Sequence, residues 1–202
     1  MTTEEMKTIR KTRRITESDF LEVNFMPDVI EKYEPVHKDL RLVKVDSNNC
    51  FDLADLSIKE DQIDFVAPNQ ESMALAFGTL NEGKYVEAFG IYDGDIPVGF
   101  VMIGHNSFDF EGCPDIYKHS YYLWRFMIDK EYQGQRYGKD AAKLVLDHIL
   151  TFPDGEEDTI ATSYEEDNIV SMNLWKSFGF VPNGEISEGE DNCEVVLVLK
   201  VK

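Results

Sequence analysis

The chain has 202 residues, of which 43% are hydrophobic and 29% charged, so a folded domain is expected and wholesale disorder is excluded. Its 39 acidic residues outnumber the 20 basic ones and give a formal net charge of −19. This balance argues against a nucleic-acid partner and against a membrane surface, because both attract clustered Lys and Arg. It is compatible with a cationic small molecule, although a solubilising surface is the simpler interpretation.

The cysteines and histidines give no sign of a disulfide framework or a metal site. Cys50, Cys113 and Cys193 are scattered and form no CxxC pair, and the four histidines show no HxH or HExxH spacing. The N-terminus has no apolar segment behind its charges, and no uncharged apolar run approaches the ~18 residues of a membrane span. These features predict a soluble, cytoplasmic protein.

Two regions of the chain differ in composition. Residues 1–38 mix charged and apolar residues and are interrupted by Pro27 and Pro35, so we expect an extension that packs on the main domain. Residues 39–202 are expected to form that domain. Its predicted elements, in chain order, are strand 40–45, helix 50–57, helix 69–80, strand 85–92, strand 98–104, strand 121–128, helix 140–150, strand 159–163, helix 169–178, strand 180–182 and strand 194–201.

The order of these elements predicts the fold class. Strands 85–92 and 98–104 are joined by the turn Asp93-Gly94-Asp95 and form a hairpin. The second half of the chain alternates strands with helices. This combination predicts an α/β (α+β) domain with one mixed, mostly antiparallel central sheet that is flanked by helices on both faces.

The segment 125–140 gives the clearest sign of chemistry, because an apolar strand runs through a short glycine-containing loop into an amphipathic helix. This order directs free backbone N–H groups and the positive end of the helix at one point, which suits a phosphate or pyrophosphate. The spacing excludes a Walker loop, since Gly134 is one residue too close to Gly138 and Asp140 occupies the Ser/Thr position. For the loop alone, a plain strand-to-helix turn is the simpler interpretation.

A wider pattern links this loop to a second stretch. Met127-Ile128 is followed by an acid and then by the loop 133–138, while Asn168 opens a helix that ends in the sequence LWKSFGF at 174–180. Together they resemble the GNAT acyltransferase superfamily, with its apolar pair and acid, its Q/R-x-x-G-x-G/A loop, and its N-x-x-x helix ending in L-Y-x-x-x-G-F. The element order from Leu40 to Val201 also fits the family.

The resemblance implies direct transfer of an acetyl group from acetyl-CoA to a primary amine, with no metal. Shorter segments are similar to bacterial spermine/spermidine (diamine) N-acetyltransferases and favour a polyamine acceptor. A backbone N–H of Met127 or Ile128 is the implied oxyanion donor, and Asn168 the implied contact to the pantetheine arm, although Asn is equally a good helix N-cap. The predicted cofactor-binding residues are Met127, Ile128, Gln133, Gly134, Gln135, Arg136, Tyr137, Gly138, Lys139 and Asn168.

Two positions depart from the family pattern. Arg136 replaces the second motif glycine, so either the loop folds without a positive φ there or Arg136 tolerates one; its side chain is also a candidate ligand for a CoA phosphate. Trp175 replaces the helix tyrosine that is often assigned as the general acid, and an indole N–H is not a practical proton donor at neutral pH. No catalytic tyrosine is therefore carried over to position 175.

The predicted catalytic residues are Tyr164 and Glu166. Tyr164 is the candidate proton donor to the thiolate, in place of the missing helix tyrosine. Glu165 and Glu166 are the candidate carboxylates that bind the amine, and Glu166 is the candidate acceptor of its proton. For either glutamate a solvated acidic loop is the simpler interpretation.

Other readings of the sequence stay open. Trp175 and Arg136 motivate an acetyl-CoA-binding sensor or degenerate GNAT module without transfer activity. An acetyltransferase that acts on protein amines is a further alternative. The apolar strand 194–201 is compatible with a homodimer formed through this strand, and equally with an internal strand.

Overall fold

The structure is a computed structural model that describes residues 27–108, 113–188 and 193–202. In these residues the chain forms a seven-stranded sheet in the order β1-β2-β3-β4-β5-β7-β6, in which β4 and β5 are parallel and the other neighbours antiparallel. The strands are β1 Leu40–Lys44, β2 Tyr85–Asp93, β3 Ile96–His105, β4 Tyr121–Ile128, β5 Thr159–Glu165, β6 Val181–Glu188 and β7 Cys193–Lys200.

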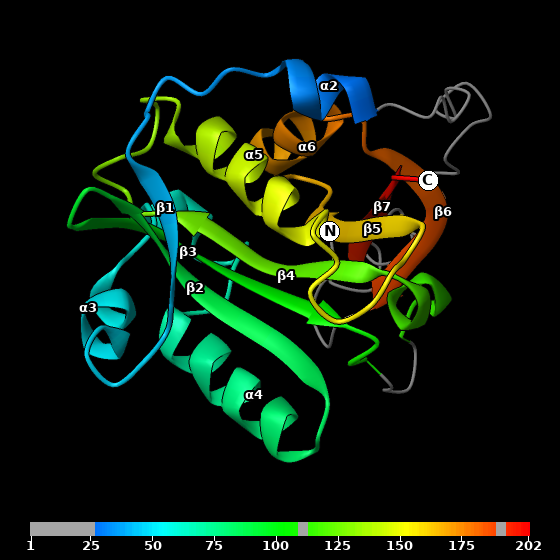
Figure 1. The fold of residues 1–202 in the computed structure, drawn as a ribbon, viewed down its shortest axis with the longest axis horizontal. Coiled ribbons are helices and arrows are strands. Elements are labelled where there is room, and N and C mark those ends of the chain that lie inside the picture. The colour runs from blue at the N-terminus through cyan, green and yellow to red at the C-terminus, as the bar shows by residue number, and fades with distance from the viewer. Residues whose placement is uncertain (1–26, 109–112, 189–192) are drawn as a thin grey trace, which may run out of the picture.

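Helices cover both faces of the sheet, so the predicted fold class is confirmed. Figure 1 shows α5 and α6 above the sheet and α3 and α4 below it. The helices are α2 Pro27–Lys32, α3 Cys50–Asp55, α4 Asn69–Asn81, α5 Tyr137–Ile149 and α6 Ile169–Lys176, with short 3-10 turns η2 Glu60–Gln62 and η3 Asp115–His119.

The core lies mainly between the sheet and α5. The buried side of this helix carries Ala141, Ala142, Val145, Leu146 and Ile149, all 0% exposed. Their spacing is that of an amphipathic helix with one apolar face. A smaller cluster, which contains Phe100, Met102 and Met127, packs on the α4 side of the sheet. The sheet is therefore held from both faces.

Several element boundaries differ from the prediction. Helix α5 begins at Tyr137 rather than 140, because the loop before it closes directly into the first helical turn. Strand β6 runs over Val181–Glu188 rather than three residues, since most of it pairs with β7 across an irregularity between Pro182 and Ile186. Strand β7 lies between β5 and β6, so the alternative of an internal strand is confirmed and β7 offers no free edge to a second copy.

The predicted extension is described only from residue 27 onward, and residues 1–26 lie outside the described part of the chain. The stretch after α2 is tied to α5 through the buried carboxylate of Asp140. This carboxylate accepts hydrogen bonds from the Tyr33 hydroxyl (2.5 Å), from the Val36 and His37 amides (3.0 and 2.9 Å), and contacts His37 Nδ1 at 2.7 Å. The boundary at residue 38 stays a prediction.

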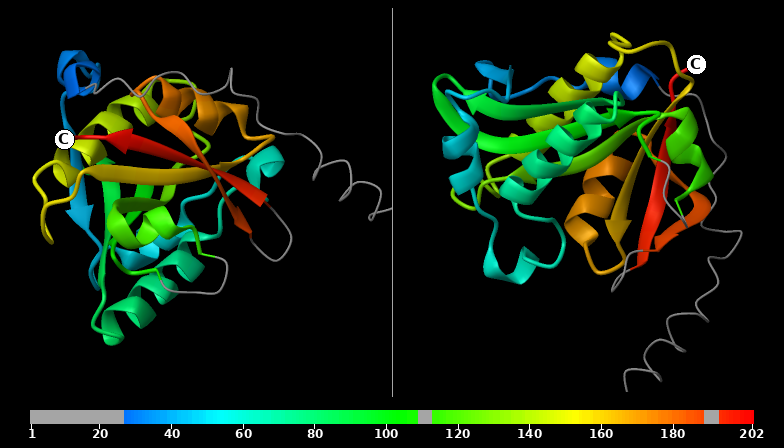
Figure 2. Two further views of the ribbon diagram at one scale, coloured as in Figure 1. Left: turned by 90° about the vertical axis from the view of Figure 1, so that its right-hand side faces the viewer. Right: turned by 90° about the horizontal axis from the view of Figure 1, so that it is seen from below.

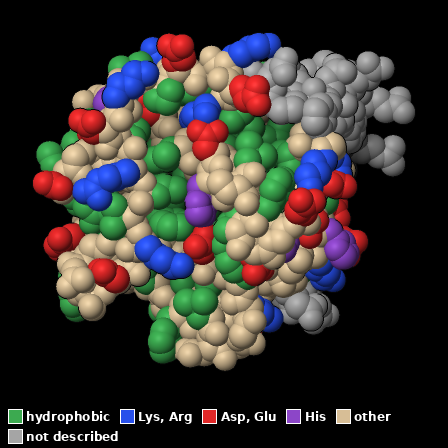
Figure 3. All heavy atoms as spheres, viewed as in Figure 1, with side chains coloured by type: hydrophobic (Ala, Val, Ile, Leu, Met, Phe, Trp, Pro, Cys, Tyr) green, Lys and Arg blue, Asp and Glu red, His purple; other side chains and the backbone are tan. Residues whose placement is uncertain are grey.

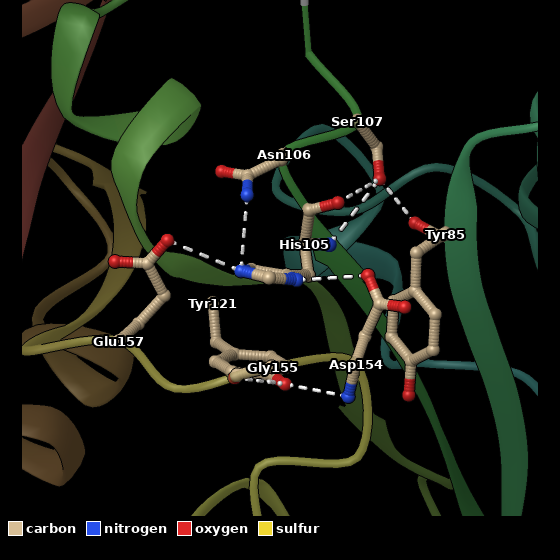
Figure 4. A network of polar contacts seen from close by, with 8 residues as sticks. All are labelled: Tyr85, His105, Asn106, Ser107, Tyr121, Asp154, Gly155 and Glu157. Atoms are coloured by element: carbon tan, nitrogen blue, oxygen red, sulfur yellow. Dashed lines mark hydrogen bonds and ion pairs between the residues drawn. The ribbon is translucent and has the colours of Figure 1, made fainter.

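A polar network fastens the start of β4 to the loop before β5 (Figure 4). The ring of His105 is 6% exposed, lies 2.9 Å from Asp154 and 3.2 Å from Glu157, and stacks on the Tyr121 ring at 4.3 Å. The Tyr121 hydroxyl donates to the Gly155 carbonyl oxygen at 2.9 Å. The two parallel strands are therefore held together at this end.

Candidate active site between strands β4 and β5

Strands β4 and β5 pair at one end only. Their parallel ladder consists of Tyr121 with Ile160, Tyr122 with Ala161 and Leu123 with Thr162, and no later residues pair. The separation begins at Trp124, which is an extra residue in β4, because Leu123 opposes Ile103 and Arg125 opposes Met102. Such a bulge bends its strand and increases its twist. In the right-hand view of Figure 2, β5, β7 and β6 run at a steep angle to β2–β4.

A cavity of about 430 Å³ fills the separation of the two strands. Its walls come from β4, β5, α6, the loop before α5 and the segment around η2. The lining residues are Ile58, Lys59, Gln62, Phe65, Val66, Leu123, Trp124, Arg125, Phe126, Met127, Ile128, Gln133, Gly134, Gly138, Thr162, Ser163, Tyr164, Asn168, Val170, Ser171, Leu174, Trp175 and Glu194. The bulge thus places a cavity beside backbone groups that do not pair with a neighbouring strand.

The phase of the β3–β4 ladder decides which backbone amide faces this space. The Asp129 amide donates to the Val98 carbonyl oxygen at 2.9 Å, so Asp129 forms a hydrogen-bonded pair with β3. Pairs alternate along an antiparallel ladder, so Met127 also bonds to β3 while Ile128 points its N–H away from it. The Ile128 carbonyl oxygen points outward too, because it accepts from Gln133 Nε2 at 3.0 Å. Of the two predicted oxyanion donors, Ile128 has the suitable direction.

The start of the loop is fixed by the carboxylate of Asp129, which is 7% exposed. Its oxygens accept hydrogen bonds from the Ser57 amide at 2.8 Å and from the Glu131 amide at 3.0 Å. The Gln133 side chain adds a hydrogen bond to Gln62 Oε1 at 2.8 Å. These contacts join the loop to the segment that forms the opposite wall of the cavity.

The end of the loop presents free amides. The Lys139 and Asp140 amides both donate to the Arg136 carbonyl oxygen, at 3.0 and 3.2 Å. The amides of Tyr137 and Gly138 come before these first helical bonds, so they are available to an anion at the positive end of α5. Gly134 has a φ of 79° and Arg136 a φ of 73°. Arg136 therefore adopts the left-handed conformation itself, the second of the two alternatives that the sequence left open.

The predicted cofactor residues divide into two groups. Met127, Ile128, Gln133, Gly134, Gly138 and Asn168 line the cavity, and Gln135, Arg136, Tyr137 and Lys139 do not. The Tyr137 hydroxyl donates to Asp93 at 2.6 Å, and this hydrogen bond raises the pKa of Tyr137 to about 12. The Lys139 ammonium lies over the ring of Tyr33 at 4.9 Å. Asn168 is also the N-cap of α6, since its Oδ1 accepts from the Ser171 amide at 3.0 Å.

The predicted catalytic residues are only partly brought together. Tyr164 is buried and lines the cavity with Trp175, which is 2% exposed. Glu165 is half-buried and Glu166 exposed, and neither is among the lining residues. Their proposed participation stays a prediction.

Sequence reasoning missed a carboxylate of the cavity. Glu194, on β7, lies opposite Glu165 in the β5–β7 ladder and lines the cavity. Its Oε2 accepts a hydrogen bond from Ser163 Oγ at 2.6 Å. The signal in the sequence was an acid at the start of the apolar run 195–199. Its position beside the end of β5 follows only from the strand order.

Arg125 also lines the cavity. Its Nη1 donates to the Trp124 carbonyl oxygen at 2.9 Å, and its guanidinium carbon lies 5.8 Å from the centre of the Trp124 ring. Its Nε is buried and has no hydrogen-bond partner among the described residues. The cavity therefore holds a cation whose donors are incompletely used.

Two properties of the described residues bear on other classes of function. No group of three or more His, Cys, Asp or Glu side chains in that part of the chain is arranged to hold a metal ion. Within the same residues, each helix is too short or too polar to cross a membrane.

Comparison with known proteins gives consistent matches to one family. The model of the acetyltransferase (GNAT) family matches residues 53–180, more than half of the chain. A spermine/spermidine N(1)-acetyltransferase of Bacillus subtilis strain 168 is 30% identical over 160 residues, which are 79% of this chain and 97% of the relative. A probable spermine N(1)-acetyltransferase of Bacillus subtilis subsp. natto is 31% identical over the same shares of the two chains.

Solved structures show a similar fold. The Vibrio cholerae spermidine N-acetyltransferase in complex with CoA and spermine has a TM-score of 0.58 and 14% identity, covering 80% of this chain and 95% of the other. The aminoglycoside acetyltransferase AAC(6′)-Ib in complex with coenzyme A and kanamycin has a TM-score of 0.63 and 12% identity, covering 80% and 94%. At these identities the likeness concerns the fold alone.

Proposed function

The chain belongs to the acetyltransferase (GNAT) family, and on this premise we propose that it moves the acetyl group of acetyl-CoA directly to a primary amine of a polyamine such as spermine or spermidine. One observation carries the proposal. The cavity between β4 and β5 connects the free amides before α5 with a carboxylate, Glu194, at the far side of the separation. A single space thus offers a site for an anionic co-substrate and a site for a cationic acceptor.

The co-substrate uses mainly backbone groups. Its pyrophosphate binds the amides of the loop up to Gly138 at the positive end of α5. Its pantetheine arm lies in the separation of the strands, beside Asn168, and its thioester carbonyl accepts a hydrogen bond from the Ile128 amide. This donor is in place before the reaction and stabilises the negative charge that develops on the oxygen of the tetrahedral intermediate.

The transfer requires two proton movements. An alkyl ammonium group with a pKa near ~10 must lose a proton before its nitrogen attacks. After attack, the C–S bond breaks and the departing thiolate takes a proton. Tyr164 is the phenol that shares the cavity with Trp175, and we assign it this second step because the indole of Trp175 does not supply a proton at neutral pH.

The polyamine acceptor is supported by the named activities of the two Bacillus relatives and by the net charge of −19, which concentrates cations. Arg125 favours a second candidate. A guanidinium at the cavity wall suits an acceptor that carries a carbonyl oxygen near its amine, as the N-terminus of a peptide does. In the described part of the chain Cys50, Cys113 and Cys193 form no disulfide, which supports a reducing, cytoplasmic location.

The test is release of thiol from acetyl-CoA across a panel of spermine, spermidine, simple diamines, an aminoglycoside and a lysine peptide. We expect turnover with the polyamines at the highest kcat/KM. Preferential turnover of the peptide supports the second candidate instead. Tight binding of acetyl-CoA without turnover of any amine contradicts both and supports a sensor.

A further inference from the structure

We propose that Glu194 binds the ammonium group of the acceptor and accepts its proton, and that Ser163 and Tyr122 position this carboxylate. The inference rests on the proposed function and names the acceptor end of the same cavity. Glu194 is the one carboxylate among the cavity-lining residues of the described chain. It is therefore the carboxylate placed to act where the amine must lose its proton.

The negative charge is a general property of the chain. On the face seen in Figure 3, acidic side chains are scattered among basic and hydrophobic ones rather than gathered around one opening. The general negative field brings a cation to the protein. A specific carboxylate inside the cavity is needed to orient one nitrogen toward the thioester.

A chain of hydroxyl groups holds this carboxylate. Ser163 Oγ donates to Glu194 Oε2 at 2.6 Å and lies 2.8 Å from the Tyr122 hydroxyl. Because the serine has one proton and gives it to Glu194, the Tyr122 hydroxyl is the donor in the second bond. Tyr122 is buried against the Tyr117 ring at 3.9 Å, and burial keeps its pKa well above the ordinary value.

This arrangement leaves Glu194 as an acceptor. Its Oε1 makes no hydrogen bond to another described residue, while Oε2 is fixed by the serine. The titratable and charged groups that surround it come from several elements. Tyr117 of η3, Tyr122 of β4 and Glu165 of β5 lie close to it, and Lys59, Arg125 and Tyr164 line the same cavity.

The reaction then balances as follows. The ammonium group gives one proton to Glu194, which becomes a neutral acid, and the free amine forms a C–N bond to the thioester carbon. Collapse of the intermediate breaks the C–S bond, and the second nitrogen proton goes to the thiolate through Tyr164. The products are the acetamide and CoA thiol, and Glu194 returns one proton to water.

The first experiment compares Glu194→Gln with the parent enzyme. We expect kcat/KM for spermine at pH 7 to fall by roughly 10²–10³-fold, because a positioned base contributes about that much. Binding of acetyl-CoA and the melting temperature report folding and should change little. Glu185→Gln is the matched control, since Glu185 is also half-buried and hydrogen-bonded in the same half of the sheet but lies outside the cavity.

A weakly basic acceptor separates a base from a merely structural residue. Trifluoroethylamine is largely neutral at pH 7 and needs no base before attack. If Glu194 is the proton acceptor, Glu194→Gln loses far less activity with this amine than with spermine. An equal loss with both amines contradicts the assignment.

The positioning residues have their own readout. Ser163→Ala removes the hydrogen bond to the ionised carboxylate, so we expect about a tenfold fall in kcat/KM and an acidic limb of the pH profile that moves to higher pH. Ser163→Thr keeps the hydroxyl and should restore both. An unmoved pH profile contradicts the positioning of Glu194 by Ser163.

The outcomes also separate the two proposals. If the parent enzyme acetylates no amine, the proposed function fails. If it acetylates spermine and Glu194→Gln does so equally well, the assignment of Glu194 fails while the proposed function stands.

Discussion

The two ends of the cavity differ in the groups that line them: backbone amides at one end and side chains at the other. The end near α5 consists of backbone amides held by a strand, a loop and a helix that follow one another in the chain. The end near Glu194 consists of side chains from β4, β5 and β7, joined by the Ser163 hydrogen bonds. We expect the first end to tolerate changes of side chain, because its donors belong to the backbone, and the second to be sensitive to the loss of single atoms.

The largest effect should come from the side-chain end. Tyr164→Phe removes the proposed proton donor to the thiolate, and we expect kcat to fall by roughly 100-fold with a small change in the KM for acetyl-CoA. The measurement is steady-state kinetics across pH. Tyr132→Phe is the control, since Tyr132 packs against Tyr137 outside the cavity. Full kcat and an unchanged pH profile for Tyr164→Phe would end this assignment.

The next effect tests what holds the backbone end in place. Asp129→Ala leaves the amides of Ser57 and Glu131 without their acceptor. We expect a loss of about 2 kcal/mol of unfolding free energy, or about 4–8 °C in Tm, because buried donors lose their partner. The KM for acetyl-CoA should rise as the loop loses its anchor. A variant with parental Tm and KM would show that the loop does not depend on this carboxylate.

A smaller effect on stability should come from Glu87, which lies outside the cavity. Burial opposes ionisation of Glu87, yet hydrogen bonds from His148 (2.7 Å) and Lys44 (3.2 Å) lower the pKa of Glu87 to about 2. The contribution of these hydrogen bonds to the free energy of unfolding is therefore complete above about pH 4.5 and is lost as the pH falls toward 2. Glu87→Gln should remove this part of the acid dependence of Tm. An identical acid profile would contradict it.

The smallest effect compares the backbone strain at Arg136 with the stabilisation that its side chain gives to the loop. Arg136 holds a left-handed conformation that costs an ordinary residue about 1–2 kcal/mol. Arg136→Gly relieves this strain but loosens the unfolded chain, so we expect a gain of about 0.5–1 kcal/mol and a rise in Tm of about 1–4 °C. A lower Tm would mean that the side chain stabilises the loop by more than its strain costs.

The same contrast explains what the sequence predicted. The sheet and its flanking helices depend on local patterns, and their prediction was confirmed. The loop 133–138 was also predicted from a local pattern, and part of it lines the cavity, but its binding of an anion stays a prediction. Tyr164 was predicted because it lies close to Asn168 in the sequence, and it does line the cavity, while its catalytic role stays a prediction. Glu194 was missed because it enters the site through the pairing of β7 with β5, about thirty residues away in the chain. Side-chain clusters of this kind depend on strand order and register, which a local pattern does not encode.

The conformation of Arg136 was left open for a similar reason. The motif indicates a positive φ, but whether arginine adopts it depends on the anchoring of both sides of the loop. The bulge at Trp124 could not be predicted from a local sequence pattern either, since it is defined by the register of β4 against β3. Yet this bulge begins the separation of the strands and with it the cavity.

The most direct test of the account is a crystal structure of the protein with CoA and spermine. We predict that the pantetheine arm lies between β4 and β5, with its sulfur end beside the Ile128 amide, and that a spermine nitrogen lies within hydrogen-bond distance of Glu194. Binding of the spermine nitrogen away from Glu194, with CoA in place, would contradict the account of the acceptor end. Absence of CoA from the separation of β4 and β5 would contradict the account as a whole.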